Sequence, residues 1–520
     1  MKHCIIGFLG CVLALPMAAQ ETYQNTRLLG NDLNGTARYV GMGGAMEALG
    51  ADISTISTNP AGLGLFRKGQ VTLSGGFLSQ PNATTHTSFE GIQASINADK
   101  NKLSFDQIGV VAPLRMGQNS YLNLGFNYHK SRNFNQILNA AARLENASQN
   151  KLSAIKYALG VNEYAWNGVD ANYENLLGGK DDQGAEVMSY LNGTAYVFGQ
   201  YQQGYIGSYD FCVSGNINDR VYLGVTLGLQ DVNYRSNTYY TENLEANAYS
   251  EMWESLKIDG TGVDIKFGAI FRPIEESPFR VGLYINTPVF YDLTMRGVND
   301  VSMTQYVNDQ AHTADCSQTA SYDYKVYTPW KFGLSMGHTV ANSLALGATY
   351  EYADYGSTDN RIISRSYYDP WYGDYYSDSE SDAAMNEHSK QSLKGVHTLK
   401  LGMEYKPISS FALRAGYNFI SSAFEKDAFR DGSIESPGSA YATSTDYTNW
   451  KATHRFTLGM GYQTGKANFD VAYQYNQTKG DFYPFMSYVG DENPANDNVA
   501  SACEVKNNRH QFLFTVGYRF

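Results

Sequence analysis

The chain has 520 residues, of which 14% are aromatic and only 17% are charged, and it contains 41 Tyr, 25 Phe and 50 Gly. About a quarter of the residues in an ordinary soluble domain are charged, so this composition is unusual for a soluble enzyme. The net charge of −12 and the lack of Lys/Arg runs with interleaved aromatic residues argue against nucleic acid as a partner. Beyond the first twenty residues, no apolar stretch reaches the roughly 18 residues that a membrane helix needs.

The first twenty residues have the pattern of a secretory signal peptide. Lys2 and His3 precede an apolar segment, residues 4–15, and small residues follow it up to Gln20. We therefore predict a signal peptide over residues 1–20 and a mature protein that leaves the cytoplasm.

The mature chain repeats an alternation of apolar and polar residues that is typical of strands in a transmembrane barrel. At the C-terminus, large apolar residues occupy every second position: Phe512, Phe514, Val516, Tyr518 and Phe520. We expect fourteen such strands, near residues 70–79, 103–113, 120–131, 205–216, 220–235, 261–273, 279–295, 322–338, 343–355, 396–407, 410–424, 452–463, 466–477 and 508–520.

The connections between these strands alternate strictly between short turns and long segments, such as 132–204, 356–395 and 478–507. Bacterial outer-membrane barrels have this polarity, with short periplasmic turns and long extracellular loops. A β-sandwich has no reason to keep it. We predict an all-β fold, a 14-stranded antiparallel transmembrane β-barrel. Apolar residues at every third or fourth position over 137–159 predict an amphipathic helix in one extracellular loop, either a landing site for substrate or a helix packed on neighbouring loops.

The segment before the first strand is rich in small residues, which allow backbone to pack tightly inside a barrel. Its motifs, in chain order, are Gly41, Gly43 and Gly44, then Asp52, then Asn59, Pro60, Ala61 and Gly62. From residue types alone, a gate and a tight connection to the first strand are equally open. The order of the motifs resembles the N-terminal hatch of the FadL family of outer-membrane transporters for long-chain fatty acids and other hydrophobic compounds.

Further short motifs agree with that family, and together they span nearly the whole mature chain: residues 267–273, 287–288, 327–333, 350–355 and 414–417. Each is weak alone, and their order makes the resemblance specific. The resemblance implies a plug over residues 21–65, a barrel over 66–520 and a location in the cell outer membrane. It also implies a plug gate formed by the motif residues above, and a lateral opening beside a kinked strand around Phe126, Asn127 and Tyr128.

The implied function is passive, gated uptake of hydrophobic compounds such as long-chain fatty acids. The partners would be this small hydrophobic ligand, outer-membrane lipids and, during biogenesis, the barrel assembly machinery. The alternative is a FadL-like barrel that binds secreted proteins as a scaffold and resembles the type IX secretion component PorV. The aromatic loop around Trp371 would suit such protein binding. An ungated polar porin is a weaker option.

Charged residues at inward positions of the predicted strands need partners inside the barrel. They are Lys400, Glu404, Arg414, Asp470 and Arg519. They could hold the plug through ion pairs or form a static network in the lumen.

The sequence offers no positive sign of catalysis or of a cofactor. The nine His lack metal-type spacing, and no Ser-His-Asp or paired-carboxylate set stands out. We expect neither enzyme activity, nor a cofactor, nor a metal. The mature chain keeps Cys212, Cys316 and Cys503, which leaves a bridge between Cys316 and Cys503 open.

Overall fold

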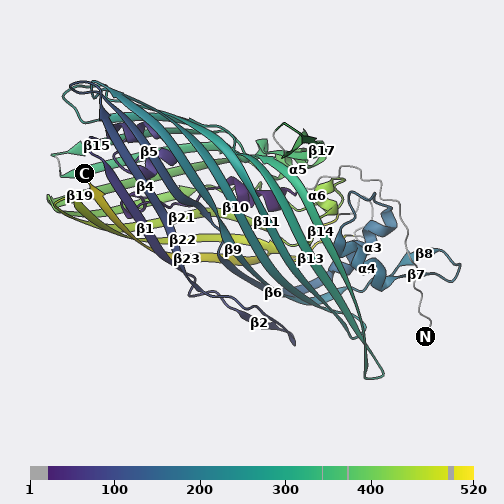
Figure 1. The fold of residues 1–520 in the computed structure, drawn as a ribbon. Coiled ribbons are helices and arrows are strands. Elements are labelled where there is room, and N and C mark those ends of the chain that lie inside the picture. Colours follow the sequence, from purple (N-terminus) through teal and green to yellow (C-terminus); the bar gives the residue numbers. More distant parts are fainter. Residues whose placement is uncertain (1–20, 342, 372–373, 490–496) are drawn as a thin grey trace.

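The computed structural model describes residues 21–341, 343–371, 374–489 and 497–520, so the predicted signal peptide lies outside the described residues. Fourteen antiparallel strands form a closed wall (Figure 1). They are β1 (Gln70–Ser79), β4 (Asn101–Arg115), β5 (Tyr121–Asn133), β9 (Gly193–Ile217), β10 (Val221–Leu244), β11 (Ala248–Phe271), β12 (Arg280–Asn286), β15 (Lys331–Val340), β16 (Leu344–Asp354), β19 (Gly395–Ile408), β20 (Phe411–Ile420), β21 (Tyr447–Thr464), β22 (Ala467–Tyr483) and β23 (Cys503–Arg519). The first and last of them, β1 and β23, pair from Gln70 opposite Arg519 to Ser79 opposite His510. The predicted 14-stranded barrel is confirmed.

The alternation in sequence becomes an apolar outside and a polar inside. Along β10, Leu223, Val225 and Leu227 are 43–53% exposed, whereas Thr226 between them is buried. A water-soluble barrel would have the opposite arrangement, so this outer surface suits lipid. Closure of the sheet also gives each of the fourteen wall strands a partner on both sides, as a membrane interior demands. No helix in the described part of the chain is long and apolar enough to cross a membrane.

We call the exposed apolar outer surface of the wall strands the apolar belt. Two strands continue beyond it as a long hairpin (Figure 1). β13 (Phe290–Val307) continues β12 after a break at residues 287–289, and β14 (Gln310–Tyr327) leads into β15 after a break at 328–330. Pro288 and Pro329 fall in these breaks, where a residue without an N–H cannot extend the ladder. The sequence predicted one uninterrupted strand at each place, over 279–295 and 322–338, so both the breaks and the extension were missed.

The remaining elements belong to the long loops. They are β2 (His86–Phe89), β3 (Ile92–Ser95), β6 (Gln136–Ala147), α3 (Gln149–Leu159), α4 (Gly168–Leu177), β7 (Gly178–Lys180), β8 (Glu186–Met188), η3 (Tyr355–Ser357), β17 (Asp359–Asp369), β18 (Asp374–Ser381), α5 (Ala383–Ser392) and α6 (Pro437–Ala440).

The predicted helix over 137–159 is wrong in its first half. Residues 136–143 pair with residues 195–202 of β9, the part that extends beyond the end of β5. An open strand edge needs backbone partners, and this need outweighs the amphipathic pattern. The helix α3 begins only after Ser148, whose hydroxyl accepts a hydrogen bond from the backbone N–H of Lys151. The question of a bridge between Cys316 and Cys503, which the sequence left open, is also answered: both are free thiols.

The segment before β1 fills the lumen. It contains α1 (Thr22–Leu29), α2 (Ala37–Gly41), η1 (Ile53–Ser57) and η2 (Pro60–Leu65), drawn in purple inside the wall in Figure 1. We call residues 21–66 the plug. Its side chains are largely buried, including Val40, Met46, Ile56 and Leu63 at 1% exposure or less.

The apolar belt gives a first prediction. Leu458 lies near the middle of β21 and is 60% exposed on the outer surface. Leu458→Arg should destabilise the barrel by about 2–4 kcal/mol, because an arginine side chain would face hydrocarbon there. Urea unfolding in lipid vesicles measures this change. Tyr306→Arg, on the β13–β14 hairpin and 41% exposed, is the control and should change little; equal effects of both variants would contradict a membrane-facing belt.

Candidate functional site: the plug and the cavity beside it

The Gly-rich segment of the plug lies with its backbone directly against the wall. Gly43 and Gly44 have φ angles of +63° and +78°, in the left-handed region that residues with a Cβ rarely adopt. The wall also has a glycine opposite them: a Cβ on Gly416 would collide with the backbone of Gly43. Gly41 approaches the next strand in the same way: its Cβ would lie 3.2 Å from the Cα of Gly459. Main chain therefore contacts main chain.

The same fit extends around most of the barrel. Ten wall strands each carry a glycine at which an added Cβ would contact the plug. These glycines are Gly109, Gly125, Gly224, Gly268, Gly282, Gly337, Gly347, Gly402, Gly416 and Gly459. We call this set the glycine belt. Where the plug presents backbone, as it does to Gly224, Gly347, Gly402 and Gly416, a larger residue in the belt must displace that backbone. Opposite Gly109 and Gly125 the nearest plug atoms belong to the side chains of Ile53 and Leu63.

The Asn-Pro-Ala-Gly turn is fixed by its own side chains. Asn59 is fully buried, and its Oδ1 accepts a hydrogen bond from the backbone N–H of Ala61 at 3.2 Å, which caps η2. Its Nδ2 donates to the carbonyl of Glu47 at 3.0 Å. Pro60 sits at the first position of η2, where its fixed φ suits the helix. A Cβ on Gly62 would lie 2.5 Å from the Thr55 hydroxyl, so η2 packs closely on η1.

Asp52 joins two parts of the plug. Its carboxylate caps η1 by accepting from the backbone N–H of Ser54 at 3.0 Å, and it also accepts from the Thr36 hydroxyl at 2.9 Å. Thr36 in turn caps α2. Asp52 thus holds α2 and η1 together, and the plug motifs predicted from sequence meet in one compact body.

Two ion-pair clusters join the plug to the wall. In the first, Glu47 of the plug accepts hydrogen bonds from Lys400 at 2.9 Å and from Thr349 at 2.8 Å, while Lys400 also pairs with Glu351 at 2.7 Å. All four side chains are largely buried.

In the second cluster, Arg38 of the plug binds Glu404 at 3.0 Å, and Glu404 also accepts from Arg414 at 2.6 Å. Arg414 then reaches Asp470 at 2.6 Å. Four of the five wall charges predicted from sequence thus belong to these clusters, and Arg519 forms none of these pairs. The plug-side partners were missed, although a charge among small residues of the plug is a signal that could have found them.

A third contact ties the start of the plug to the wall. Asp32 accepts hydrogen bonds from Arg455 at 3.1 Å, from Arg509 at 3.4 Å and from the backbone N–H of Asn133 at 2.9 Å. Burial opposes ionisation of Asp32, but the charges of Arg509, Arg132 and Arg455 outweigh it and lower its pKa to about 2. Asp32 is therefore a carboxylate at every ordinary pH.

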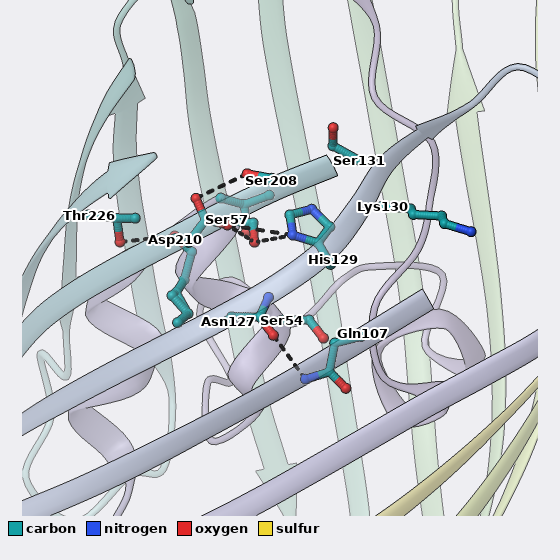
Figure 2. A network of polar contacts seen from close by, with 12 residues as sticks. Ser54, Ser57, Gln107, Asn127, His129, Lys130, Ser131, Ser208, Asp210 and Thr226 are labelled. Carbon is teal, nitrogen blue, oxygen red and sulfur yellow. Dashed lines mark hydrogen bonds and ion pairs between the residues drawn. The ribbon is translucent and has the colours of Figure 1, made fainter. Parts of the chain in front are cut away.

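Figure 2 shows a polar network where η1 meets the wall. The Ser57 hydroxyl donates to Asp210 at 2.7 Å and lies 3.3 Å from Nδ1 of His129. Asp210 also binds Lys266 at 2.9 Å, and Lys266 reaches Asp264 at 2.7 Å. In a hydrolase triad the serine bonds to the histidine and the carboxylate orients that histidine. Here the serine donates to the carboxylate directly, so the trio serves as an anchor for the plug.

A cavity of about 290 Å³ lies between α1, the rest of the plug and the wall. One part of its lining is aromatic: Tyr23, whose ring stacks on Phe424 at 5.1 Å, with Tyr447 and Trp450. Another part is cationic: Arg132, Arg455, Arg509, Lys331 and Lys400. Carboxylates also line the cavity: Asp32 and Glu351, which pair with Arg455 and Lys400, and Glu21 and Asp446. The lining thus offers an aromatic surface to an apolar body, and cations to an anionic group that competes with these carboxylates. Across the described residues, no three His, Cys, Asp or Glu side chains are grouped so as to hold a metal ion.

The residues predicted to flank a lateral opening lie in an unbroken part of β5. Phe126, Asn127 and Tyr128 pair with both β4 and β9, and Asn127 is buried and accepts a hydrogen bond from Gln107 at 2.8 Å. The kink expected there is displaced: the register shift lies between Lys130 and Arg132. Pairing of β5 with β4 ends at His129, because the following residues turn toward Asp32, whose backbone N–H donates to Ser131.

The geometry defines a plugged 14-stranded β-barrel with an internal cavity. No family model and no curated protein sequence matches the chain. A solved structure of a Pseudomonas aeruginosa FadL homologue is similar over 94% of this chain and 99% of its own, with 12% sequence identity and a TM-score of 0.52. The chain therefore has the FadL-type fold.

Two toluene transporters also align over 94% of this chain and 99% of theirs. They are TbuX of Ralstonia pickettii, with 11% identity and a TM-score of 0.47, and TodX of P. putida, with 10% identity and a TM-score of 0.48. At these TM-scores, neither adds to the assignment of the fold.

Asp32 gives a pH-dependent prediction. Asp32→Asn leaves two arginines without their anion, and loss of one partner of a buried pair costs about 3–5 kcal/mol. In the wild type the same stabilisation is complete above the ordinary carboxyl pKa of 3.8 and is lost as pH falls toward about 2. Pepsin digestion between pH 5 and pH 2 should therefore cleave the plug of the wild type near Leu28 only close to pH 2. The plug of the variant should be cleaved at every pH in this range.

The matched control for this experiment is Asp99→Asn, which removes an exposed pair with Lys102 at 3.0 Å. It should leave the pH dependence of cleavage unchanged. If Asp32→Asn also behaved like the wild type, the third contact would not hold the plug.

The glycine belt gives another prediction. Gly416→Ala forces a methyl group onto the backbone of Gly43, so the plug must shift and the barrel should conduct more ions in a planar bilayer. Gly75→Ala is the control, since its nearest neighbour would lie 3.4 Å away, an ordinary contact. Equal conductance of the two variants would show that the fit against the belt does not seal the lumen.

Proposed function

We propose that the protein is a passive, gated channel of the bacterial outer membrane for hydrophobic compounds with an anionic group, such as long-chain fatty acids. Its membrane location is supported by the outer apolar belt and by the fold that it shares with a FadL homologue. The observation that carries the proposal is the cavity, whose aromatic and cationic parts lie beside a plug held by ion pairs.

The cavity and Asp32 suggest how the plug responds to a ligand. Asp32 pairs with Arg455 and Arg509, and both arginines line the cavity. A ligand carboxylate would offer them an anionic oxygen in place of Oδ1 of Asp32, which accepts from both arginines. It would compete with Asp32, while its alkyl chain lies against Tyr23 and Trp450. Loss of the third contact would then free the beginning of the plug.

The exit that we propose is sideways, where β5 stops pairing with β4. The two strands separate beyond His129, close to the predicted residues Phe126, Asn127 and Tyr128. An apolar molecule that left there would enter lipid without crossing water. The driving force would be the concentration gradient of the ligand.

We also propose that transport involves no covalent chemistry, in keeping with the arrangement of Ser57, His129 and Asp210. The scaffold alternative stays a prediction from sequence. Trp371 is 87% exposed, but no contact in the described structure favours a protein partner over transport.

The test is binding of oleate to the purified protein, measured by native mass spectrometry or by displacement of a fluorescent fatty acid. Arg455→Gln with Arg509→Gln should weaken binding at least tenfold, since each charge-assisted hydrogen bond is worth about 1.5–3 kcal/mol. The control is Arg115→Gln with Arg365→Gln, two exposed arginines away from the cavity. Unchanged affinity of the first variant, or no oleate binding by the wild type, would contradict the proposal.

A further inference from the structure

The outer surface of the barrel carries a repeated pair of side chains. A tyrosine on one strand lies within hydrogen-bond distance of Nδ1 of a histidine on the next. The pairs are Tyr350 with His397 at 2.7 Å, Tyr417 with His454 at 2.8 Å, and Tyr473 with His510 at 2.8 Å. They occur on β16 and β19, on β20 and β21, and on β22 and β23, so the same arrangement recurs across one side of the wall.

The tyrosine occupies one ring nitrogen of its histidine. Where the phenol donates to Nδ1, the ring proton is on Nε2. None of the three Nε2 atoms has a hydrogen-bond partner within the described residues. Each pair thus presents an N–H donor on the outer surface, at a depth where aromatic residues of a barrel meet the lipid headgroups.

A second repeat places these pairs at one boundary of the apolar belt. Each histidine is followed eight residues later by an exposed tyrosine: Tyr405, Tyr462 and Tyr518. Eight residues of strand span about 26 Å, or roughly 20 Å along the membrane normal at the usual tilt. The interval between histidine and tyrosine therefore matches the apolar belt, with the histidines on the side of the long loops.

Lysines lie just beyond the histidines on that same side. They are Lys394, Lys451, Lys479 and Lys506, with side chains 38–56% exposed. Lys479 and Lys506 are directly opposite in the register of β22 and β23, an arrangement of like charges that costs energy. They share one carboxylate, Glu504, at 3.3 Å and 3.7 Å. This pair of lysines can therefore accept a further anion.

We propose that this side of the barrel, from β16 to β23, binds the phosphate-bearing headgroup of an outer-leaflet lipid. The phosphates would lie between Lys479 and Lys506, the Nε2–H groups of the histidines would donate to headgroup oxygens, and the acyl chains would run along the exposed Leu458 and Phe514. The proposal rests on the outer-membrane location proposed above, but it is independent of the ligand inside the barrel.

The experiment uses the full mature protein in detergent with lipid A that carries two phosphates, and native mass spectrometry counts the lipid retained. Lipid A with the same acyl chains but without phosphates is the comparison. Lys479→Gln with Lys506→Gln should lower retention of the phosphorylated lipid roughly 10- to 30-fold, because each lysine near an anionic surface contributes about 1 kcal/mol. Replacing both lysines by Arg should preserve retention.

The matched control is Lys68→Gln with Lys466→Gln, which removes two charges at the opposite end of the barrel. It should retain lipid like the wild type. Tyr350→Phe, Tyr417→Phe and Tyr473→Phe together keep the rings but free the histidines, and should lower retention by a smaller factor. Equal retention of the two lipid A forms, or an equal loss in the control, would overturn the proposal.

Two readouts keep this test separate from that of the proposed function. Oleate binding should be unchanged in the Lys479 and Lys506 variant and lost in the Arg455 and Arg509 variant. Lipid retention should fall in the Lys479 and Lys506 variant and stay unchanged in the Arg455 and Arg509 variant. Unchanged gel mobility of the unheated barrel shows that each variant is folded.

Discussion

A charge inside a lipid-embedded barrel is stable only beside a partner of opposite sign, and in this chain the wall and the plug both supply those partners. Lys400 and Glu404 point into the lumen, and each meets a plug residue, Glu47 or Arg38. Arg455 and Arg509 meet Asp32. The polar interior, which follows from the apolar exterior, therefore requires the plug as much as the plug requires the wall.

The close backbone contacts at the glycine belt fix the position of the plug more tightly than the ion pairs do. Ion pairs alone tolerate small shifts, because long side chains can follow their partners. Backbone against backbone cannot shift in this way, and the contact between Gly43 and Gly416 leaves no room for even a methyl group. The three charged contacts with the wall also differ in position. Asp32 lines the cavity, Glu47 reaches it only through its partner Lys400, and Arg38 and Glu404 lie outside its lining. A ligand in the cavity can thus act on Asp32 while the pair of Arg38 with Glu404 keeps the plug in register.

Strand existence was predictable, because outward apolar and inward polar residues leave a strong alternation in segments such as Phe512–Phe520. Strand ends were not. Along β14, residues 310–321 are mostly exposed on both faces, so the alternation fades although the ladder continues. Residues 136–147 have a helical spacing, yet pairing with the free edge of β9 decides their conformation.

The candidate site was predictable in part for a similar reason. Glycines and the Asn59-Pro60 turn are local signals, and wall charges are visible against apolar strands. Which plug residue meets which wall residue depends on contacts more than 300 positions apart, such as Arg38 with Glu404, and residue type carries no record of them. The pairing of β5 with β4 ends beside the hydrogen bond between Asp32 and Ser131, so this end could not be found in the strand itself.

The pairing of β1 with β23 has a consequence for how the molecule is made. The seam joins the first strand to the last, so the cylinder closes only when residue 519 has found residue 70, the slowest kind of contact for a chain to form. The plug is synthesised first but has ten strands to fit against. A wall that closed before the plug was in place would have to admit it past contacts at the glycine belt that leave no room for a methyl group. We therefore expect the sheet to close around the plug.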